Sequence, residues 1–319
     1  MDKMTIKQNR RLRSCLLLLI SSLVLGSSVL ASAHEVDVRD DVLGWVKNDT
    51  RRFLNAVIRV GDLNRTIEFY MECFGMKLLS SKDFPEEKYT KAIVGFGPQA
   101  SHFVIELVYH YGVKSYDLGT AFGHFGIVAE DIYPIVERVR QHGGKITREP
   151  GTMGGGSQVF AFVEDTNGYS FELLQKGPTP EPLSHVMLQV TDLNRSVSFY
   201  EKALGMNVLQ SYDSPTDGFA IAMMGYGSDL NKTVAVELKY NYNITRYTPG
   251  NVYVHLAIGT DDVYRSAAAV ALVAEEIGGR IIRPPGLYRR HVQSFSFVDP
   301  EGRKTVLVDN KDYLRSIQG

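Results

Sequence analysis

Imidazole and carboxylate side chains recur at regular places inside apolar segments of this 319-residue chain. They occupy four pairs of positions with nearly equal spacing, in which Asn55 replaces an imidazole and Val306 replaces a carboxylate. The pairs are Asn55 and Glu106, His124 and Glu172, His185 and Glu237, and His255 and Val306. A carboxylate or an imidazole is costly to bury in an apolar strand without a partner, so its regular return needs a physical reason. Coordination of a shared metal ion is one, because the ion provides every ligand with a positive charge.

One residue of this kind carries little weight by itself. His255 alone is more often a hydrogen-bonded core residue than a ligand, and Glu106 alone is more often a solvent-facing residue. Four such residues in register are a much stronger signal. Two imidazole nitrogens and two carboxylate oxygens, with room left for water, suit a six-coordinate nickel, cobalt, manganese or zinc ion better than a closed structural zinc site. The open positions would let two neighbouring substrate oxygens bind the ion, which stabilises a developing oxyanion.

The elements that must position these residues follow from an internal repeat. Residues 184–309 repeat residues 54–174, and a weaker repeat inside each half, seen at 60–63 and 128–131, divides the chain into four units. Each unit contains an alternating strand, an amphipathic helix and then short strands. We therefore expect an α+β fold of four βαβββ modules that form two tandem domains, residues 51–176 and 183–319.

Turn-forming residues mark the limits of these modules. Gly-Gly pairs at 143–144 and 278–279 are expected to end the helices of the second and fourth modules. Residues 165–168 and 299–302 are typical of hairpin turns that precede a last strand. Residues 177–182 include three prolines and are predicted to form a stiff linker between the domains.

The four pairs also predict which modules face each other. The second and third modules keep His124, Glu172, His185 and Glu237, whereas the first has Asn55 in place of an imidazole and the fourth has Val306 in place of a carboxylate. Pairing the second module with the third gives one complete tetrad and one degenerate site. Pairing neighbours within each half would leave both sites incomplete, so we expect one working site, with one divalent ion.

Charge and composition favour a small-molecule partner. The chain has 35 basic and 36 acidic residues spread throughout, for a net charge of −1. No long-range field therefore attracts nucleic acid or an anionic membrane. After removal of its leader the protein is expected to be a monomer without a membrane or nucleic-acid partner.

Residues 1–33 are typical of a targeting leader. Several basic residues precede an apolar run from Cys15 to Leu25, and Ala31-Ser32-Ala33 offers a cleavage site. Such a leader indicates entry into the secretory pathway or an organelle such as a plastid, with a membrane anchor or a cytoplasmic location as alternatives. Residues 34–50 form an N-terminal extension, and Cys73 is the one cysteine left, so the fold needs no internal disulfide.

Several longer motifs resemble glyoxalase I (lactoylglutathione lyase), in the fused two-domain form common in plants, within the vicinal-oxygen-chelate superfamily. They include Arg-Val-Gly-Asp-Leu-Asn-Arg at 59–65, Ser-His-Phe-Val-Ile-Glu-Leu at 101–107, Phe-Gly-His-Phe-Gly-Ile at 122–127 and Ile-Gly-Thr-Asp-Asp-Val-Tyr at 258–264. The resemblance covers about residues 45–317, nearly the whole mature chain.

The resemblance implies a ligand set and a reaction. It makes His124, Glu172, His185 and Glu237 the metal ligands. Glu172 would also be the catalytic base, and Glu237 could share or exchange that role with it. The reaction it implies is the isomerisation of the hemithioacetal of methylglyoxal and glutathione, the co-substrate, into S-lactoylglutathione through an enediolate.

The family resemblance also implies anchors for the glutathione carboxylates. Arg195 and Asn241 of the third module are the expected anchors, since an arginine matches a carboxylate bidentately. The first module keeps Arg65 but has His110 in place of the asparagine, so the degenerate site has changed here as well.

Some residues depart from the family pattern. Plant relatives usually have glutamine at the positions of His185 and His255, so the tetrad here is similar to the bacterial arrangement. Gly154 and Ser157 stand where plant relatives commonly carry lysines, which predicts a weaker hold on glutathione.

Two other functions remain open on the sequence alone. An iron-dependent extradiol dioxygenase of the same superfamily would want two histidines and one carboxylate, so the second glutamate argues against it. A non-catalytic small-molecule binding module would explain the altered loop and the degenerate site.

Overall fold

The computed structural model describes residues 39–152, 156–288 and 291–318. The chain divides into two compact units, residues 1–45 and residues 46–319. Residues 39–45, the described part of the first unit, are helical. The expected leader at residues 1–33 lies outside the described residues, as does Gly154.

The second unit contains the four expected modules, each with one strand, one helix and three further strands. The first module comprises β1 (Phe53–Arg59), α2 (Leu63–Phe74), β2 (Lys77–Phe84), β3 (Tyr89–Gly95) and β4 (Val104–His110). The second comprises β5 (Phe122–Ala129), α3 (Tyr133–Gln141), β6 (Lys145–Gly151), β7 (Phe160–Glu164) and β8 (Ser170–Gln175). The third comprises β9 (Leu183–Val190), α4 (Leu193–Leu204), β10 (Asn207–Ser214), β11 (Phe219–Gly225) and β12 (Ala235–Asn241). The fourth comprises β13 (Tyr253–Thr260), α5 (Val263–Ile277), β14 (Arg280–Tyr288), β15 (Val292–Val298) and β16 (Lys304–Asp309). The module pattern did not predict the helix that follows it, α6 (Asn310–Ser316).

Local chemistry explains why the repeated motifs form the same helices. The Asp62 side chain accepts a hydrogen bond from the Arg65 backbone N–H and so caps the start of α2, and Asp192 caps α4 in the same way. At the other end, Gly75 and Gly205 adopt left-handed backbone conformations (φ 77° and 66°), which glycine reaches without steric cost. The Gly-Gly pair at 278–279 directly follows α5, and the pair at 143–144 lies one residue beyond the end of α3, as predicted.

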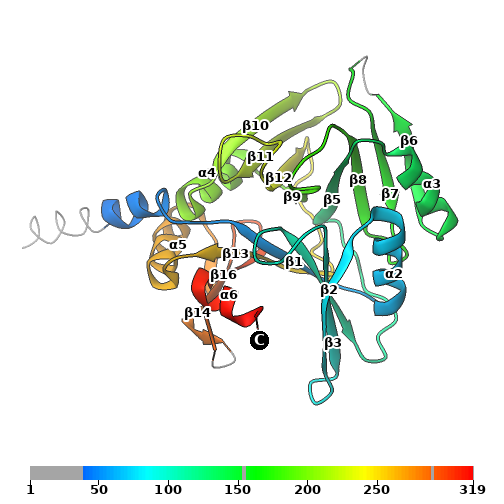
Figure 1. Ribbon diagram of the computed structural model, residues 1–319. Coiled ribbons are helices and arrows are strands. Elements are labelled where there is room, and N and C mark those ends of the chain that lie inside the picture. The colour runs from blue at the N-terminus through cyan, green and yellow to red at the C-terminus, as the bar shows by residue number, and fades with distance from the viewer. Residues whose placement is uncertain (1–38, 153–155, 289–290, 319) are drawn as a thin grey trace, which may run out of the picture. The chain divides into compact units, whose positions relative to one another are not determined.

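Sheet pairing crosses the two halves of the sequence. The described strands form two eight-stranded sheets, one in the order β10-β11-β12-β9-β5-β8-β7-β6 and the other in the order β14-β15-β16-β13-β1-β4-β3-β2 (Figure 1). The second and third modules therefore share one sheet, joined by the antiparallel pair β5 and β9, and the first and fourth share the other, joined by β1 and β13. The predicted module pairing is confirmed.

Helix packing holds each half of the sequence together. Helix α2 packs against α3, and α4 packs against α5. Both hairpin turns before the last strands form as predicted, and each adds a buried hydrogen bond between modules: Tyr70 Oη donates to Asp165 (2.9 Å), and Tyr200 Oη donates to Asp299 (3.0 Å). Each half is thus joined by helices and a turn, while each sheet joins one half to the other.

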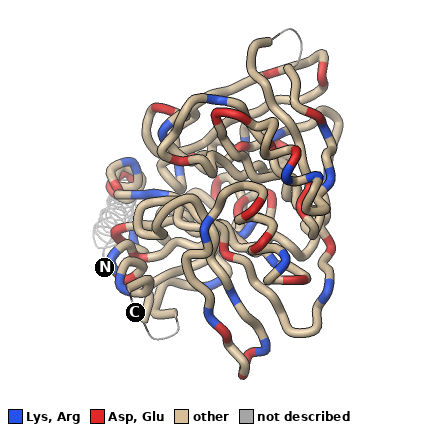
Figure 2. Tube along the Cα trace, turned by 45° about the vertical axis from the view of Figure 1, so that its right-hand side comes forward, with Lys and Arg blue, Asp and Glu red and all other residues tan. Residues whose placement is uncertain are grey.

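Acidic and basic residues are interspersed along the described trace, as the small net charge suggested (Figure 2). Within the described part of the chain, helices that combine the length and the apolar character needed to cross a bilayer are absent.

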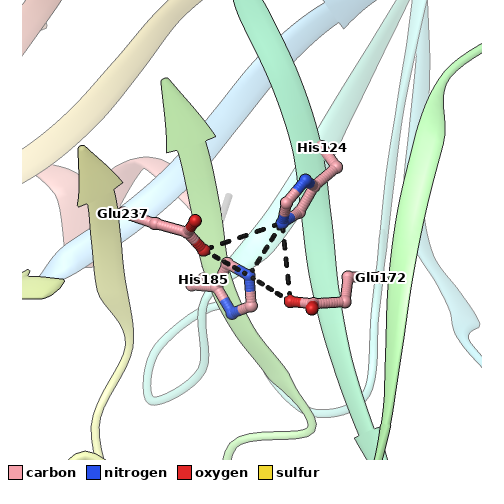
Figure 3. Close-up of side chains that lie close together, drawn as sticks. All are labelled: His124, Glu172, His185 and Glu237. Atoms are coloured by element: carbon pink, nitrogen blue, oxygen red, sulfur yellow. Dashed lines mark hydrogen bonds and ion pairs between the residues drawn. The ribbon is translucent and has the colours of Figure 1, made fainter. Parts of the chain in front are cut away.

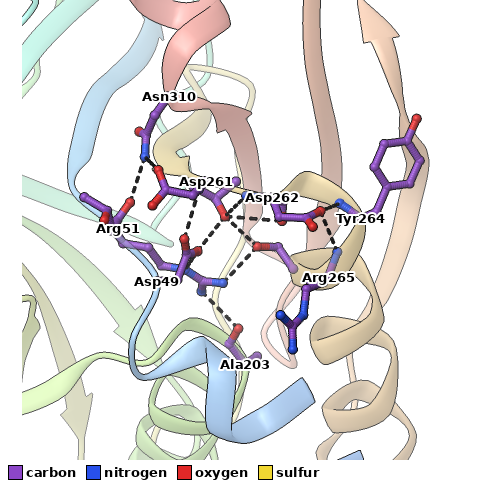
Figure 4. A network of polar contacts seen from close by, with 11 residues as sticks. Asp49, Arg51, Ala203, Asp261, Asp262, Tyr264, Arg265 and Asn310 are labelled. Carbon is purple, nitrogen blue, oxygen red and sulfur yellow. Dashed lines mark hydrogen bonds and ion pairs between the residues drawn. The ribbon is translucent and has the colours of Figure 1, made fainter. Parts of the chain in front are cut away.

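A buried ion pair fastens the segment before β1 to the third and fourth modules. Arg51 Nε lies 2.7 Å from Asp49 Oδ2, and both side chains are fully buried (Figure 4). The same guanidinium donates to the Ala203 carbonyl oxygen at the end of α4 and to Ser266 Oγ in α5. Thr260 Oγ1 donates to Asp49 as well, so the pair has the additional hydrogen bonds that a buried pair needs.

We expect Asp49→Ala to destabilise the protein by about 3–5 kcal/mol, because it leaves the Arg51 guanidinium buried without its counter-charge. Urea unfolding at equilibrium measures the change. Glu276→Ala is the matched control, because it removes a pair of similar length (2.6 Å to Lys202) whose side chains are 44–45% exposed, and it should change the midpoint little. Equal effects of the two substitutions would contradict the role given to the buried pair.

Candidate metal centre

Four side chains from four strands meet at the seam between β5 and β9. His124 comes from β5, Glu172 from β8, His185 from β9 and Glu237 from β12 (Figure 3). The two imidazole Nε2 atoms lie 3.2 Å apart, Glu172 Oε2 lies 3.3 Å from His185 Nε2 and 3.6 Å from His124 Nε2, and Glu237 Oε2 lies 3.4 Å and 3.7 Å from the same nitrogens. The candidate ligand atoms all lie within 4.8 Å of one another. The structure therefore brings the whole predicted tetrad together.

The surrounding backbone leaves space for the imidazoles. Gly126 of β5 lies opposite both His185 and Glu172 in the sheet. A Cβ atom on Gly126 would come within 1.9 Å of His185 Cε1, so any other residue there would displace the ring. The glycine is a requirement of the site rather than of the strand.

Ser184 favours the tautomer of His185 that a ligand needs. Ser184 Oγ donates its one proton to the Gly126 carbonyl oxygen at 3.2 Å, so it accepts the contact at 3.0 Å from His185 Nδ1. The proton of a neutral imidazole is then on Nδ1, and the Nε2 lone pair faces the centre of the tetrad. Such outer partners commonly fix the ligating nitrogen of a metal-binding histidine.

The groups of the tetrad shift the pKa values of Glu172 and His185. Burial opposes the ionisation of Glu172, but the hydrogen bonds and charges of His124 and His185 outweigh it and hold the pKa of Glu172 well below its usual range. Burial also favours a lower pKa for His185, but the hydrogen bond with Glu172 and the charges of both carboxylates raise it overall. A cation bound to His185 Nε2 would have to displace any proton on that nitrogen.

The donor set fits a divalent cation. His124, His185 and Glu237 are 3–6% exposed and Glu172 is partly buried, and two carboxylates with so little access to water favour a positive charge at their centre. Nitrogen and carboxylate oxygen donors together suit nickel, cobalt, manganese or zinc. Among the described residues this is the group that brings three or more histidine, cysteine or acidic ligand atoms together.

One side of the tetrad opens into a cavity of about 540 Å³, which is within the usual range for small-molecule sites. Glu172, His185 and Glu237 line it. The other lining residues come from strands of the second and third modules, from the segments before β7 and β12, and from the linker with Lys176 before it: Val128, Gln158, Leu174, Lys176, Gly177, Pro178, Thr179, Ser184, Gln210, Ser211, Tyr212, Ile221, Met223, Leu230 and Asn231.

The pair of strands β1 and β13 forms a second seam, which joins the first and fourth modules. It places the residues of the degenerate site at positions equivalent to those of the tetrad. Ala257 of β13 lies opposite both Asn55 and Val306, just as Gly126 lies opposite His185 and Glu172. His255 lies two residues before Ala257, as His124 lies two before Gly126. The sheet register thus supports the sequence equivalence of the four pairs.

The second seam differs from the first in charge. Lys91 Nζ lies 3.3 Å from Glu106 Oε2. In the strand register of the first seam, the position that corresponds to Lys91 is Ile221, which lines the metal-site cavity, so an apolar side chain stands there in place of the cation. Burial and the nearby charge of Lys304 lower the pKa of His255 to about 3, so this imidazole is neutral. A lysine cation therefore balances the glutamate at this seam.

The expected glutathione anchors Arg195 and Asn241 do not line the cavity. Arg195 Nε donates to the Ile277 carbonyl oxygen (2.8 Å) at the end of α5, where a cation is favourable for the helix dipole. Asn241 Nδ2 donates to Gln189 and to Tyr247. Their contact with glutathione stays a prediction.

Other predicted positions also lie apart from the tetrad. Arg65 in the first turn of α2 has its guanidinium near Gly143, after α3, in the same relation as Arg195 to α5. His110 Nδ1 contacts Tyr116 Oη at 3.0 Å. Ser157 is exposed.

Sequence reasoning missed the part that the linker plays in the cavity. Its prolines indicated a spacer, yet residues 177–179 form part of the cavity wall and Lys176 adds a cation there. Lys176 directly follows β8, the strand that carries Glu172, and this position could have indicated that the start of the linker lies near the site.

Comparison with known proteins places the fold in a family. The model of the glyoxalase/bleomycin resistance protein/dioxygenase superfamily matches residues 52–173 and 183–306. A lactoylglutathione lyase of Arabidopsis thaliana is 55% identical over 87% of this chain and 98% of its own length, and a probable chloroplastic lactoylglutathione lyase of the same plant is 53% identical over 92% of this chain and 83% of its own. The crystal structure of glyoxalase I from Zea mays is similar with a TM-score of 0.84 and 55% identity, covering 86% of this chain and 98% of that one.

We expect His124→Ala to lose tight binding of a divalent ion, because it removes one of four donors from a closely spaced set. Metal analysis after equilibrium dialysis against nickel measures the content per chain. His255→Ala, the equivalent change at the second seam, is the control and should keep one ion per chain. If His255→Ala removed the ion and His124→Ala kept it, the assignment of the working seam would be reversed.

Metal affinity should rise with pH through the range in which His185 titrates. Its pKa lies above the usual value of about 6.5, and the proton must leave before Nε2 can bind a cation. Calorimetry in two buffers with different ionisation enthalpies measures the protons released. Binding without proton release, at an affinity independent of pH, would show that the imidazoles are not ligands.

Proposed function

The chain belongs to the glyoxalase/bleomycin resistance protein/dioxygenase superfamily, and we propose that it is a lactoylglutathione lyase whose metal centre is the tetrad between β5 and β9. The observation that carries the proposal is the convergence of His124, Glu172, His185 and Glu237 on one point beside a cavity. The similarity to lactoylglutathione lyases extends over most of the chain, so both halves that build this seam take part in it.

The proposed reaction is the isomerisation of the hemithioacetal of glutathione and methylglyoxal into S-lactoylglutathione. It requires that a proton leave C1 of the adduct and that a proton be delivered to C2. A bound divalent cation would polarise the two neighbouring oxygen atoms of the adduct. Nickel, cobalt, manganese and zinc all match the donor set.

Glu172 is the better placed of the two carboxylates to transfer the proton. Its side chain is 17% exposed and lines the cavity, whereas the side chain of Glu237 is 8% exposed. In its ionised form this carboxylate can accept a proton from C1. The same oxygen can then return that proton to C2, because both carbons are adjacent.

The cavity walls match the two ends of such a substrate. Ile221, Met223 and Leu174 supply apolar surface, and Lys176 supplies a cation for a carboxylate of glutathione. We propose Lys176 as an anchor on this ground, since Arg195 is held at the end of α5.

The two other functions fit the site less well. An extradiol dioxygenase site would need two imidazoles and one carboxylate, whereas here a second carboxylate lies at the same short distances from both rings. A non-catalytic binding module would not need an ionised base on the cavity wall.

We expect Glu172→Gln to lower kcat by about 10²–10⁴-fold, the usual contribution of a general base, because the amide cannot accept the C1 proton. Thioester formation from methylglyoxal and glutathione is followed by ultraviolet absorbance, and metal content is measured on the same sample. Glu106→Gln, which removes the carboxylate of the second seam where Val306 takes the place of Glu172, should leave turnover near wild type. Full activity of Glu172→Gln with its ion bound would exclude Glu172 as the base.

A further inference from the structure

Helix α6 stands at the second seam where the linker stands at the first. It starts directly after β16, as Lys176 and the linker directly follow β8. Residues 177–179 of the linker form one wall of the metal-site cavity. Helix α6 instead packs against β13, β15 and β16, the strands of the fourth module at and beside the second seam (Figure 1). The same place after a last strand thus holds an extended segment in one half and a helix in the other.

The residues that α6 contacts correspond to the lining of the metal-site cavity. Three residues of the second seam are equivalent, by the repeat, to residues that line that cavity: Leu54 to Ser184, Gly259 to Val128, and Val308 to Leu174. Tyr313 of α6 forms an apolar cluster with Leu54 and Ala257, and Val308 packs against this cluster. A Cβ atom on Gly259 would come within 2.1 Å of Asn310 Oδ1, at the start of α6. The helix therefore fills the place at the second seam that the cavity fills at the first.

The Tyr313 side chain lies near the degenerate site itself. It packs on Ala257, the residue at the centre of the second seam, and the Arg52 guanidinium lies over its ring at 5.6 Å from the centroid. Burial raises the pKa of Tyr313 to about 12, Arg52 opposes this shift, and the charge of Glu106 adds to it. Glu106 is the equivalent of the metal ligand Glu237. A neutral phenol thus lies close to the position where the first seam has room for an ion and a substrate.

Helix α6 is held less firmly than the modules. Of its seven residues, Tyr313 is the buried one, and its Oη is inaccessible to solvent without a hydrogen-bond partner among the described residues, which is unfavourable. Its polar contacts with the modules include Asp312 Oδ2, which accepts from the Gln293 backbone N–H (2.9 Å), and Asn310 Nδ2, which donates to the Thr50 carbonyl oxygen (2.8 Å). A helix this short at the end of a chain has little stability of its own. Its release should therefore cost less free energy than unfolding of the modules.

We propose that α6 is a plug that closes a second cavity, the equivalent of the metal-site cavity, and that it undocks locally while the four modules stay folded. Undocking uncovers an apolar floor of Leu54, Ala257 and Val308, with the Arg52 guanidinium and Glu106 nearby. Such a surface suits the ring or alkyl chain of a small molecule in the place of the tyrosine ring. The plug thus limits the chain to one open cavity.

Thiol labelling tests the undocking. In the full chain with Cys15→Ser, Ala257→Cys places a thiol under α6, at a position that is 4% exposed. The natural Cys73 is the internal reference, because it is fully buried between modules that must unfold to expose it. Iodoacetamide labels both cysteines at a series of urea concentrations below the unfolding transition, and peptide mass spectrometry reads each one. The introduced thiol should react at least about a hundredfold faster than Cys73 and with little dependence on urea, because a local opening costs less free energy and exposes less surface.

Ala56→Cys is the matched control. Ala56 is fully buried and pairs with Leu256, the neighbour of Ala257, so it faces the other side of the same sheet. Its thiol should react as slowly as Cys73. Deletion of residues 310–319 should leave a chain that still unfolds cooperatively, in which the thiol of Ala257→Cys approaches the rate of an exposed thiol and that of Ala56→Cys stays protected.

Three results would overturn the proposal. In the full chain, the thiol of Ala257→Cys could react as slowly as Cys73 and with the same urea dependence, so that α6 opens only with the modules. The truncated chain could fail to fold, which would make α6 part of the core. It could also fold and keep that thiol protected, so that no cavity lies beneath α6. These readouts need neither metal nor substrate, so they are independent of the proposed lyase function.

Discussion

The mutual burial of two imidazoles and two carboxylates at the β5–β9 seam is the constraint on which the rest of the structure depends. His185 and Glu172 are costly to remove from water, and they are tolerated because each faces a partner within 4 Å and a cation can bind at their centre. The seam must therefore keep its register, since a slip of one residue would turn the ligands to the opposite face of the sheet. The absence of a side chain at Gly126 and the hydrogen bonds of Ser184 serve the same geometry.

The architecture gives the chain two such seams from one repeated unit. Helix packing and the Tyr70–Asp165 and Tyr200–Asp299 hydrogen bonds hold together the modules of each half, whereas the sheets join modules from different halves. Both halves must fold before either seam exists. The two seams have the same register but different side chains, so the four positions of the second seam can change without altering the fold. Lys91 beside Glu106 shows the outcome, because an ammonium group now provides the positive charge there.

Spacing alone does not choose between two possible partners of a side chain. Arg195 has the charge to bind a carboxylate, and its contact with glutathione stays a prediction; in the structure its Nε donates to the Ile277 carbonyl oxygen at the end of α5. The prolines of the linker predict a stiff segment, but they could not indicate that residues 177–179 line the metal-site cavity while Glu181 lines another. Helix α6 follows the last module and has no counterpart in the repeat, so the repeat could not predict it.

The sequence alone determined the modules, because helix caps such as Asp62, glycine turns and the alternation of apolar residues act locally. It also determined the module pairing and the tetrad, because Asn55 and Val306 leave one pairing of modules that gives a complete set of ligands. Only the tertiary structure decided which other side chains reach the site. Strand register fixes the ligands to within one residue, but the direction of a long side chain such as Lys176 or Arg195 depends on competition among neighbours that are distant in the sequence, and local patterns carry no record of it.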